Sequence, residues 1–162
     1  MRSKSFEGMA CSIATALEAV GDRWAMLVLR DLMLGLSRYD DLRKSTDITN
    51  ATLTDRLRHL EQTGLVDLLT PKGRDLSLVI QALAQVGDRW RLQQQAQPPM
   101  RFVRAQSGTP LRLALVEEES GQSVPFSELR VEAGPGADDL TRWRLSKLAA
   151  QARTPAAAPG AD

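Results

Sequence analysis

Residues 49–52 form a short run of small polar side chains with the chemistry needed to read base edges in DNA. The amide of Asn50 can pair with both hydrogen-bonding groups that adenine presents in the major groove. The methyl groups of Ala51 and of the flanking Thr49 and Thr52 can meet the methyl group of thymine. Such readout requires that the first turn of a helix points into the groove. We therefore take these four residues as candidate base contacts.

Basic side chains on either side of this run are placed to neutralise DNA phosphates. The candidates are Arg38, Lys44, Arg56 and Arg58. Acidic residues are interspersed with them, so the alternative is a solvated surface of ion pairs. These acidic residues are Asp40, Asp41, Asp47, Asp55 and Glu61. The sequence leaves both interpretations open.

A helix-turn-helix is needed to hold these side chains, and the sequence predicts one. Three leucines recur at helical spacing behind the polar run and give a helix over residues 49–62 one buried face: Leu53, Leu57 and Leu60. Thr49 or Asn50 begins this helix, and residues 46–48 form the tight turn before it. Earlier helices are predicted over residues 13–20, 23–34 and 38–44, with Ser12, Asp22 and Ser37 as their caps.

A strand over residues 65–69 and a long helix over residues 72–95 are predicted next, with Pro71 opening the helix. This helix carries an apolar stripe that is too hydrophobic to face solvent, which predicts a homodimer interface. The stripe consists of Leu76, Val79, Ile80, Leu83, Val86 and Trp90. The helix also repeats, at residues 86–90, the peptide Val-Gly-Asp-Arg-Trp of residues 20–24. Two copies are too few for a repeat fold, so we interpret them as coincidence or as shared helix-breaking chemistry.

The order of several short motifs over residues 11–90 resembles the HxlR-type, MarR-like winged helix-turn-helix transcriptional regulators of bacteria. The motifs are Cys11-Ser12-Ile13, Gly21-Asp22-Arg23-Trp24, Leu29-Arg30-Asp31-Leu32, Arg38-Tyr39-Asp40-Asp41-Leu42, Leu53 through Glu61, Gly64-Leu65-Val66 and Leu69-Thr70-Pro71-Lys72-Gly73. The resemblance covers more than half of the chain. It implies a dimer formed through the first and last helices of the domain and operator binding through residues 49–62.

The chain departs from this family in two segments. Members of the family have a β-hairpin wing where this chain has only Asp67 and Leu68 between Val66 and Leu69, so the wing is expected to be truncated. Some longer members have a cysteine-paired ribbon after the dimer helix. Residues 102–131 are similar to that ribbon in length and turns but contain no cysteine, so neither zinc nor any other metal or cofactor is expected.

Cys11 is the single cysteine of the chain, which excludes an internal disulfide framework. It stands just before a predicted helix, whose N–H groups favour a thiolate, and Arg2 and Lys4 are near in sequence. The resemblance implies a sensor of oxidants or electrophiles, although Ser12 replaces the proline that often follows this cysteine in the family. The alternative is a small buried side chain.

The C-terminal part of the chain changes character after Pro98 and Pro99. Short strands are predicted over residues 100–105, 111–118 and 124–132, and a terminal helix over residues 140–153. The predicted organisation is a DNA-binding and dimerisation domain (residues 10–97), a small β appendage (98–136), a C-terminal helix (137–153) and a disordered tail (154–162). Residues 1–10 are expected to be poorly fixed.

Composition limits the functional classes. Of the 162 residues 43% are hydrophobic, as in globular proteins, and the net charge of +1 predicts only modest non-specific attraction to DNA. There is no apolar run of about eighteen residues, which predicts a cytoplasmic protein without a membrane partner. Nucleophile elbows, phosphate loops and metalloprotease motifs are absent from the sequence, so an enzyme is not expected.

Together these observations predict a mostly α fold: a winged helix-turn-helix with a truncated wing, followed by a small β appendage and a terminal helix. The predicted function is transcriptional control, as a repressor that binds a pseudo-palindromic operator in double-stranded DNA as a homodimer. One alternative is a dimeric protein-interaction module that lost its DNA affinity with the wing. Another is a regulator with a small-molecule effector that enters near Trp24 or Trp90.

Overall fold

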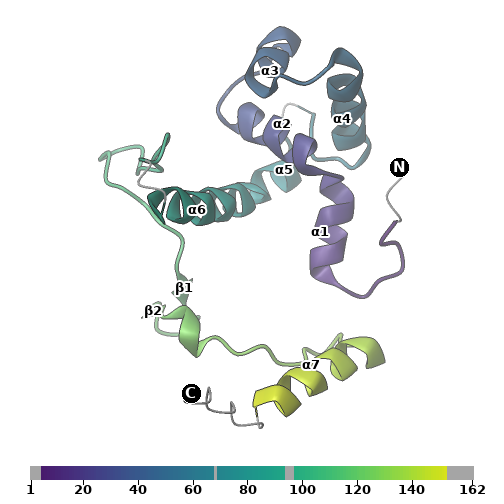
Figure 1. Cartoon of the computed structure of the whole chain (residues 1–162), viewed down its shortest axis with the longest axis vertical. Coiled ribbons are helices and arrows are strands. Elements are labelled where there is room, and N and C mark those ends of the chain that lie inside the picture. Colours follow the sequence, from purple (N-terminus) through teal and green to yellow (C-terminus); the bar gives the residue numbers. More distant parts are fainter. Residues whose placement is uncertain (1–4, 68, 94–96, 153–162) are drawn as a thin grey trace, which may run out of the picture.

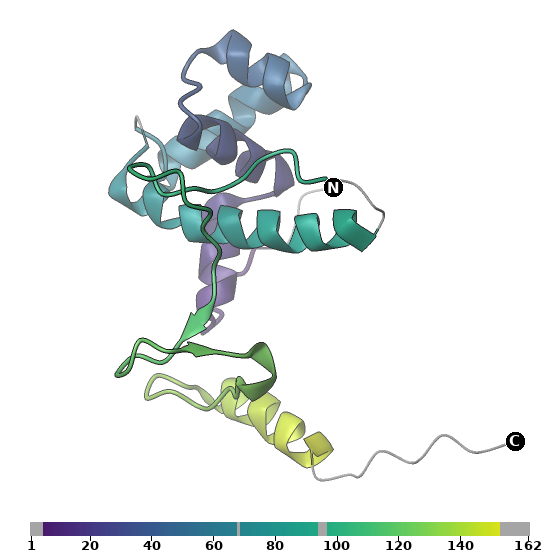
Figure 2. The same ribbon diagram turned by 90° about the vertical axis from the view of Figure 1, so that its left-hand side faces the viewer.

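The computed structural model describes residues 5–67, 69–93 and 97–152. Six helices come first along the chain: α1 (Ser12–Val20), α2 (Arg23–Met33), α3 (Tyr39–Thr46), α4 (Asn50–Gln62), α5 (Pro71–Asp75) and α6 (Ser77–Gln93). They are followed by β1 (Leu115–Val116), β2 (Ser123–Val124), a 3-10 turn (Phe126–Glu128) and α7 (Asp139–Ala152). Figures 1 and 2 show α1 to α6 gathered together, with β1, β2 and α7 projecting from them. The predicted mostly helical fold with a small sheet is confirmed.

The hydrophobic core is built around α2. Val28 and Leu29 of this helix are fully buried, and they belong to one cluster with buried residues of α3 and α4, among them Leu42, Leu53 and Leu60. Each fully buried side chain of this kind contributes about 1.5–3 kcal/mol relative to an exposed one. The core therefore fixes α3 and α4 against α2 through the leucine spacing recognised in the sequence.

The helix starts follow the predicted caps in part. Asp22 caps α2 by accepting hydrogen bonds from the N–H groups of Trp24 (2.9 Å) and Ala25 (3.0 Å). The caps predicted at Ser12 and Ser37 are wrong, because α1 begins at Ser12 itself and the N-cap position of α3 is Arg38. The residues at the two N-cap positions, Cys11 and Arg38, form no capping hydrogen bond with their side chains.

The strand predicted over residues 65–69 is wrong. The N–H groups of Leu65 and Val66 both donate to the carbonyl oxygen of Leu60, at 2.9 and 3.2 Å, and the chain turns there. Leu69 has a positive φ of 57°, which also breaks an extended run, and Leu68 lies outside the described residues. A strand needs a partner, and without a hairpin the described residues between α4 and α5 offer none. The turn instead closes the end of α4.

The helix predicted over residues 72–95 is two helices, α5 and α6, which meet at Leu76. Pro71 occupies the first position of α5, as predicted, and Thr70 caps it by accepting from the N–H of Gly73 at 3.1 Å. Residues 94 and 95 lie outside the described part.

The two copies of Val-Gly-Asp-Arg-Trp have different structures. Gly21 ends α1 with a φ of 89°, and a Cβ atom there would lie 2.8 Å from Nε2 of His59. Gly87 lies inside α6, where an added Cβ meets no described atom within 4 Å. The same five residues therefore break one helix and continue another, because tertiary neighbours differ.

Alanine substitution at these two glycines is expected to have opposite effects on stability. Gly21→Ala combines left-handed backbone strain with a clash against His59, and it should lower the free energy of unfolding by about 1–3 kcal/mol. Gly87→Ala replaces an interior helical glycine and should raise it by about 0.5–1 kcal/mol. Urea unfolding followed by circular dichroism measures both. Equal destabilisation by the two variants would contradict the continuous α6.

The C-terminal appendage contains less sheet than predicted. β1 and β2 pair antiparallel with Leu115 opposite Val124, and one isolated bridge joins Val103 to Pro110. The side-chain amide of Gln85 attaches this region to α6. It donates to the carbonyl oxygen of Leu113 at 3.1 Å and accepts from the N–H of Leu113 at 2.9 Å. Arg153 and the tail over residues 154–162 lie outside the described residues.

The chain before α1 is better fixed than predicted where the structure describes it. Ser5 Oγ and the N–H of Phe6 each donate to the carboxylate of Glu18 at 2.9 Å. The Phe6 hydrogen bond, followed by that of Ser5, holds the pKa of Glu18 below its ordinary value.

Among the described helices, none has the length and apolar content required to cross a membrane.

Candidate nucleic-acid interface

The start of α4 is fastened to α3 by Tyr39. Its hydroxyl donates to the carbonyl oxygen of Asn50 at 2.9 Å and lies 3.1 Å from Oγ1 of Thr54. This contact fixes the angle between the two helices of the helix-turn-helix. The sequence analysis assigned no role to Tyr39. Its position as the one tyrosine of the chain, at the start of the first of these helices, is a signal that could have indicated this contact.

The middle of α4 is fastened to the start of α2 by Arg56. Its Nε lies 3.2 Å from Oδ2 of Asp22, and its terminal nitrogen Nη2 lies 3.2 Å from Oδ2 of Asp55. Only 27% of the Arg56 side chain is exposed. Asp22 thus caps α2 with one carboxylate oxygen and meets α4 with the other. This placement favours the ion-pair alternative for Arg56 over a phosphate contact.

The four candidate base contacts divide into two pairs. Oγ1 of Thr49 accepts from the N–H of Thr52 at 3.2 Å and lies 2.9 Å from the Thr52 hydroxyl, so both side chains complete the cap of α4. Asn50 and Ala51 are exposed in the first turn. Thr54 is also exposed, one turn beyond Asn50, and was missed although the spacing of four residues places it on the same face. Apart from the cap, the exposed side chains in the first two turns of α4 on this side are therefore Asn50, Ala51 and Thr54.

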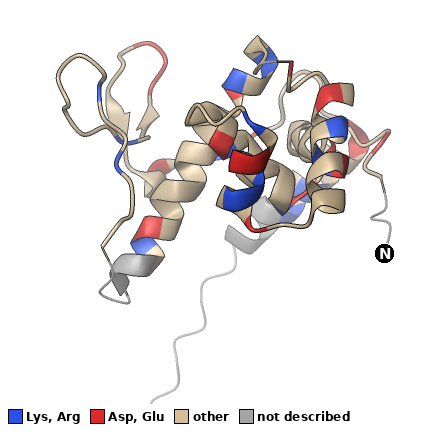
Figure 3. Ribbon diagram, turned by 90° about the horizontal axis from the view of Figure 1, so that it is seen from above, with Lys and Arg blue, Asp and Glu red and all other residues tan. Residues whose placement is uncertain are grey.

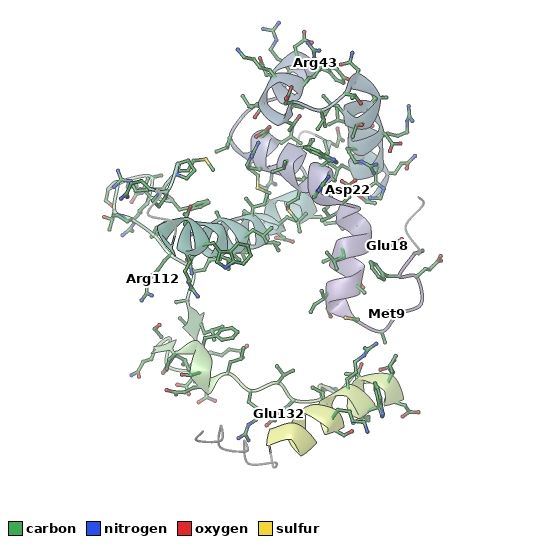
Figure 4. All side chains as sticks on the ribbon, viewed as in Figure 1. Met9, Glu18, Asp22, Arg43, Arg112 and Glu132 are labelled. Atoms are coloured by element: carbon green, nitrogen blue, oxygen red, sulfur yellow. The ribbon has the colours of Figure 1, made fainter. Side chains whose placement is uncertain are left out.

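The remaining basic candidates point to solvent from α3 and α4. Arg38, Lys44 and Arg58 are exposed, and none of them forms a salt bridge with an acidic side chain of the described residues. Arg43, beside Lys44 in the last turn of α3, is likewise exposed and was missed; Figure 4 shows it at the outer end of that helix. The structure thus brings these cations to the two helices that flank the turn at Asp47.

Acidic residues are mixed with these cations. Asp55 and Glu61 lie on the exposed side of α4 together with Arg58, and Asp40 and Asp41 occupy the first turn of α3. Figure 3 shows this interspersion of charges and, by contrast, the uncharged central part of α6. Any electrostatic attraction to DNA is consequently local, and it comes from Arg43 and Lys44 at the end of α3 and from Arg58 in the middle of α4.

The residues of the apolar stripe in the predicted dimer interface lie in two different environments. Leu76 and Ile80 pack against the core of their own chain. The other four members remain exposed: Val79 (41%), Leu83 (55%), Val86 (40%) and Trp90 (63%). On α1, Ile13 (72%) and Leu17 (52%) are also exposed. Both helices assigned to the dimer therefore have uncovered apolar side chains.

Cys11 lies at the N-cap position of α1 and is half-buried. Its carbonyl oxygen, rather than its thiol, accepts hydrogen bonds from the N–H and the hydroxyl of Thr15. The position at a helix start agrees with the sequence analysis, and Arg2 and Lys4 lie outside the described residues. A redox-sensing role for Cys11 stays a prediction.

Known proteins with similar sequences are regulators. A family model described as an HxlR-like helix-turn-helix matches residues 19–95. An HTH-type transcriptional regulator of Mycobacterium tuberculosis is 33% identical over 147 residues, which cover 83% of this chain and 91% of that protein. The regulator YdeP of Bacillus subtilis is 31% identical over 103 residues, 55% of this chain and 79% of that protein.

Two solved structures extend the similarity to about four fifths of the chain. PA1607, described as a candidate transcription factor, superposes with a TM-score of 0.66 at 28% identity and covers 81% of this chain and all of that one. PA1374 from Pseudomonas aeruginosa, described in the same terms, gives 0.59 at 35% identity, covering 83% of this chain and all of that one. These relatives are regulators rather than enzymes. The family model matches the helix-turn-helix of this chain, and the mycobacterial regulator is 33% identical to the chain along most of its length. The chain therefore belongs to the HxlR-like helix-turn-helix family of transcriptional regulators and has a helix-turn-helix DNA-binding domain.

Proposed function

We propose that the protein is a homodimeric repressor that binds a pseudo-palindromic operator by placing α4 of each subunit in the major groove. One observation carries this proposal: the first two turns of α4 expose Asn50, Ala51 and Thr54, while the opposite face is buried through Leu53 and Leu60. A groove-reading helix needs this division, with one face anchored and the other offering hydrogen bonds and methyl groups. Arg58 and Lys44 supply the phosphate contacts.

The dimer brings two such helices to one face of the duplex. Uncovered apolar side chains on α1 and α6 support a two-fold interface, and two α4 helices spaced about 34–36 Å apart would enter successive major grooves. A dimer bound in this way over a promoter would exclude RNA polymerase and so repress transcription. The protein would act in the cytoplasm, where bacterial DNA is accessible.

The missing wing favours a second candidate, a dimeric interaction module without DNA affinity. The described residues between α4 and α5 contain no hairpin that could contact a minor groove. The part of the appendage formed by β1, β2 and the labelled Arg112 does not take its place, because it lies on the other side of α6 from α3 and α4 (Figures 1 and 4). Fewer phosphate contacts predict weaker, less salt-dependent binding than in winged relatives.

Fluorescence anisotropy with the DNA upstream of the protein's own gene tests the proposal. Asn50→Ala should cost about 1–3 kcal/mol at one operator position and relax specificity there. Arg58→Ala should weaken binding to all sequences and reduce the salt slope by about one unit. Arg112→Ala, on the far side of α6, is the matched control and should bind like wild type. If the wild-type chain prefers no sequence even at low salt, the interaction-module candidate replaces the repressor.

A further inference from the structure

A cavity of about 520 Å³ lies between α2, α6 and the segment over residues 99–102. Met26 and Met33 line it from α2, Ile80 and Ala84 from α6, and Met100 and Phe102 from the closing segment. This volume lies within the range of small-molecule sites, which are mostly apolar clefts of about 300–1,000 Å³. Neither Trp24 nor Trp90, the positions considered from the sequence, lines the cavity.

The lining selects for an uncharged aromatic ligand. Three of the five methionines of the chain line this one cavity, and methionine side chains adapt their shape and make favourable contacts with aromatic rings. The guanidinium of Arg30 is paired with Asp31 at 2.7–2.8 Å, which already compensates its charge. Asp88 and Arg101, the other charged lining residues, have opposite signs. Because Arg30 is paired with Asp31 and the other two charges have opposite signs, the lining offers an ionic ligand no excess of one charge.

The cavity borders the predicted dimer interface and shares a single exposed residue with it. Of the four exposed stripe residues only Leu83 lines the cavity, whereas Val79, Val86 and Trp90 do not. A second subunit on α1 and α6 thus leaves the walls formed by α2 and by residues 99–102 to a ligand.

The position of α2 connects the cavity to the DNA-facing helices. Met26 and Met33 line the cavity, while Val28 and Leu29 of the same helix pack in the core with Leu42 of α3 and with buried leucines of α4. Protein interiors are close-packed, so a shift of α2 against α6 moves its core partners too. We propose that the cavity binds an uncharged aromatic small molecule and that its occupation changes the affinity of α4 for DNA; the second half of this statement rests on the proposed function.

Titration of the full chain with the uncharged fluorophore N-phenyl-1-naphthylamine tests the site. We expect saturable fluorescence enhancement with one site per chain. Met100→Lys places a charge in the lining and should weaken binding by about tenfold or more. Met9→Lys makes the same change at a residue of equal exposure outside the cavity (42%, against 44% for Met100) and should leave binding unchanged.

A second variant distinguishes a blocked cavity from a misfolded protein. Ala84→Trp fills the cavity from α6 and should also abolish binding, while Ala133→Trp adds the same indole to an exposed loop position and should not. Circular dichroism verifies that each variant is folded. Enhancement that does not saturate, or that survives both Met100→Lys and Ala84→Trp, overturns the site. So does a wild-type chain that binds no probe because a second copy fills the cavity.

Operator anisotropy with and without saturating probe tests the coupling separately. We expect the apparent Kd for DNA to change by about threefold or more in the wild type and to stay constant in Met100→Lys. Probe binding without any change in DNA affinity overturns the coupling and leaves the site standing. A chain that binds no operator overturns the proposed function, while the fluorescence titration still decides the site.

Discussion

Val86→Arg is expected to convert the proposed dimer into monomers and to lower operator affinity by about 100-fold or more. The substitution places a charge in the exposed apolar stripe of α6, where burial against a second copy would leave it unpaired. Monomers lose the gain of about 10²–10⁴ that comes from holding two half-sites at once. Sedimentation velocity measures the assembly and anisotropy measures the DNA affinity.

Leu78→Arg is the control for this prediction. Leu78 lies in the same helix and is 61% exposed, but it is outside the stripe, so this variant should remain dimeric and bind DNA normally. A wild-type chain that sediments as a monomer at micromolar concentration would remove the basis for a two-fold operator.

Gly73→Ala is expected to destabilise the fold by about 2–4 kcal/mol. Gly73 is buried in α5, and a Cβ atom there would overlap the backbone carbonyl oxygen of Leu65, which cannot move without disturbing the end of α4. Urea unfolding measures the change. Gly134→Ala, where an added Cβ meets no described atom, should stay within about 0.5 kcal/mol of wild type. A small effect at Gly73 would contradict this close approach of α5 to the turn after α4.

The helix-turn-helix was predictable because its signals are local. The leucine spacing of α4, the cap at Asp22 and Pro71 at the start of α5 act within one or two turns, and the structure places all three as expected. The prediction of a strand over residues 65–69 failed because a strand depends on a partner, and the described residues between α4 and α5 supply none. Apolar residues there close a helix end instead, with Leu65 buried.

The sequence placed the candidate site on the helices of the helix-turn-helix, but it did not show which contacts each side chain makes. The sequence left Arg56 open between a phosphate contact and an ion pair, because Asp22 comes from a helix start far earlier in the chain and only the packing of α4 on α2 reveals this pair. Similarly, Tyr39 reaches Asn50 and Thr54 only through the crossing of α3 and α4. Roles that depend on such crossings are not encoded in the spacing of neighbouring residues.

Hydroxyl-radical footprinting on the preferred operator tests most directly that two α4 helices of one dimer read successive major grooves. The predicted pattern is two protected patches on one face of the duplex, with centres about 10 base pairs apart and related by a two-fold axis. Asn50→Ala should weaken both patches equally, because each subunit uses the same residue. A single patch, or no protection above that of unrelated DNA at low salt, would contradict the account.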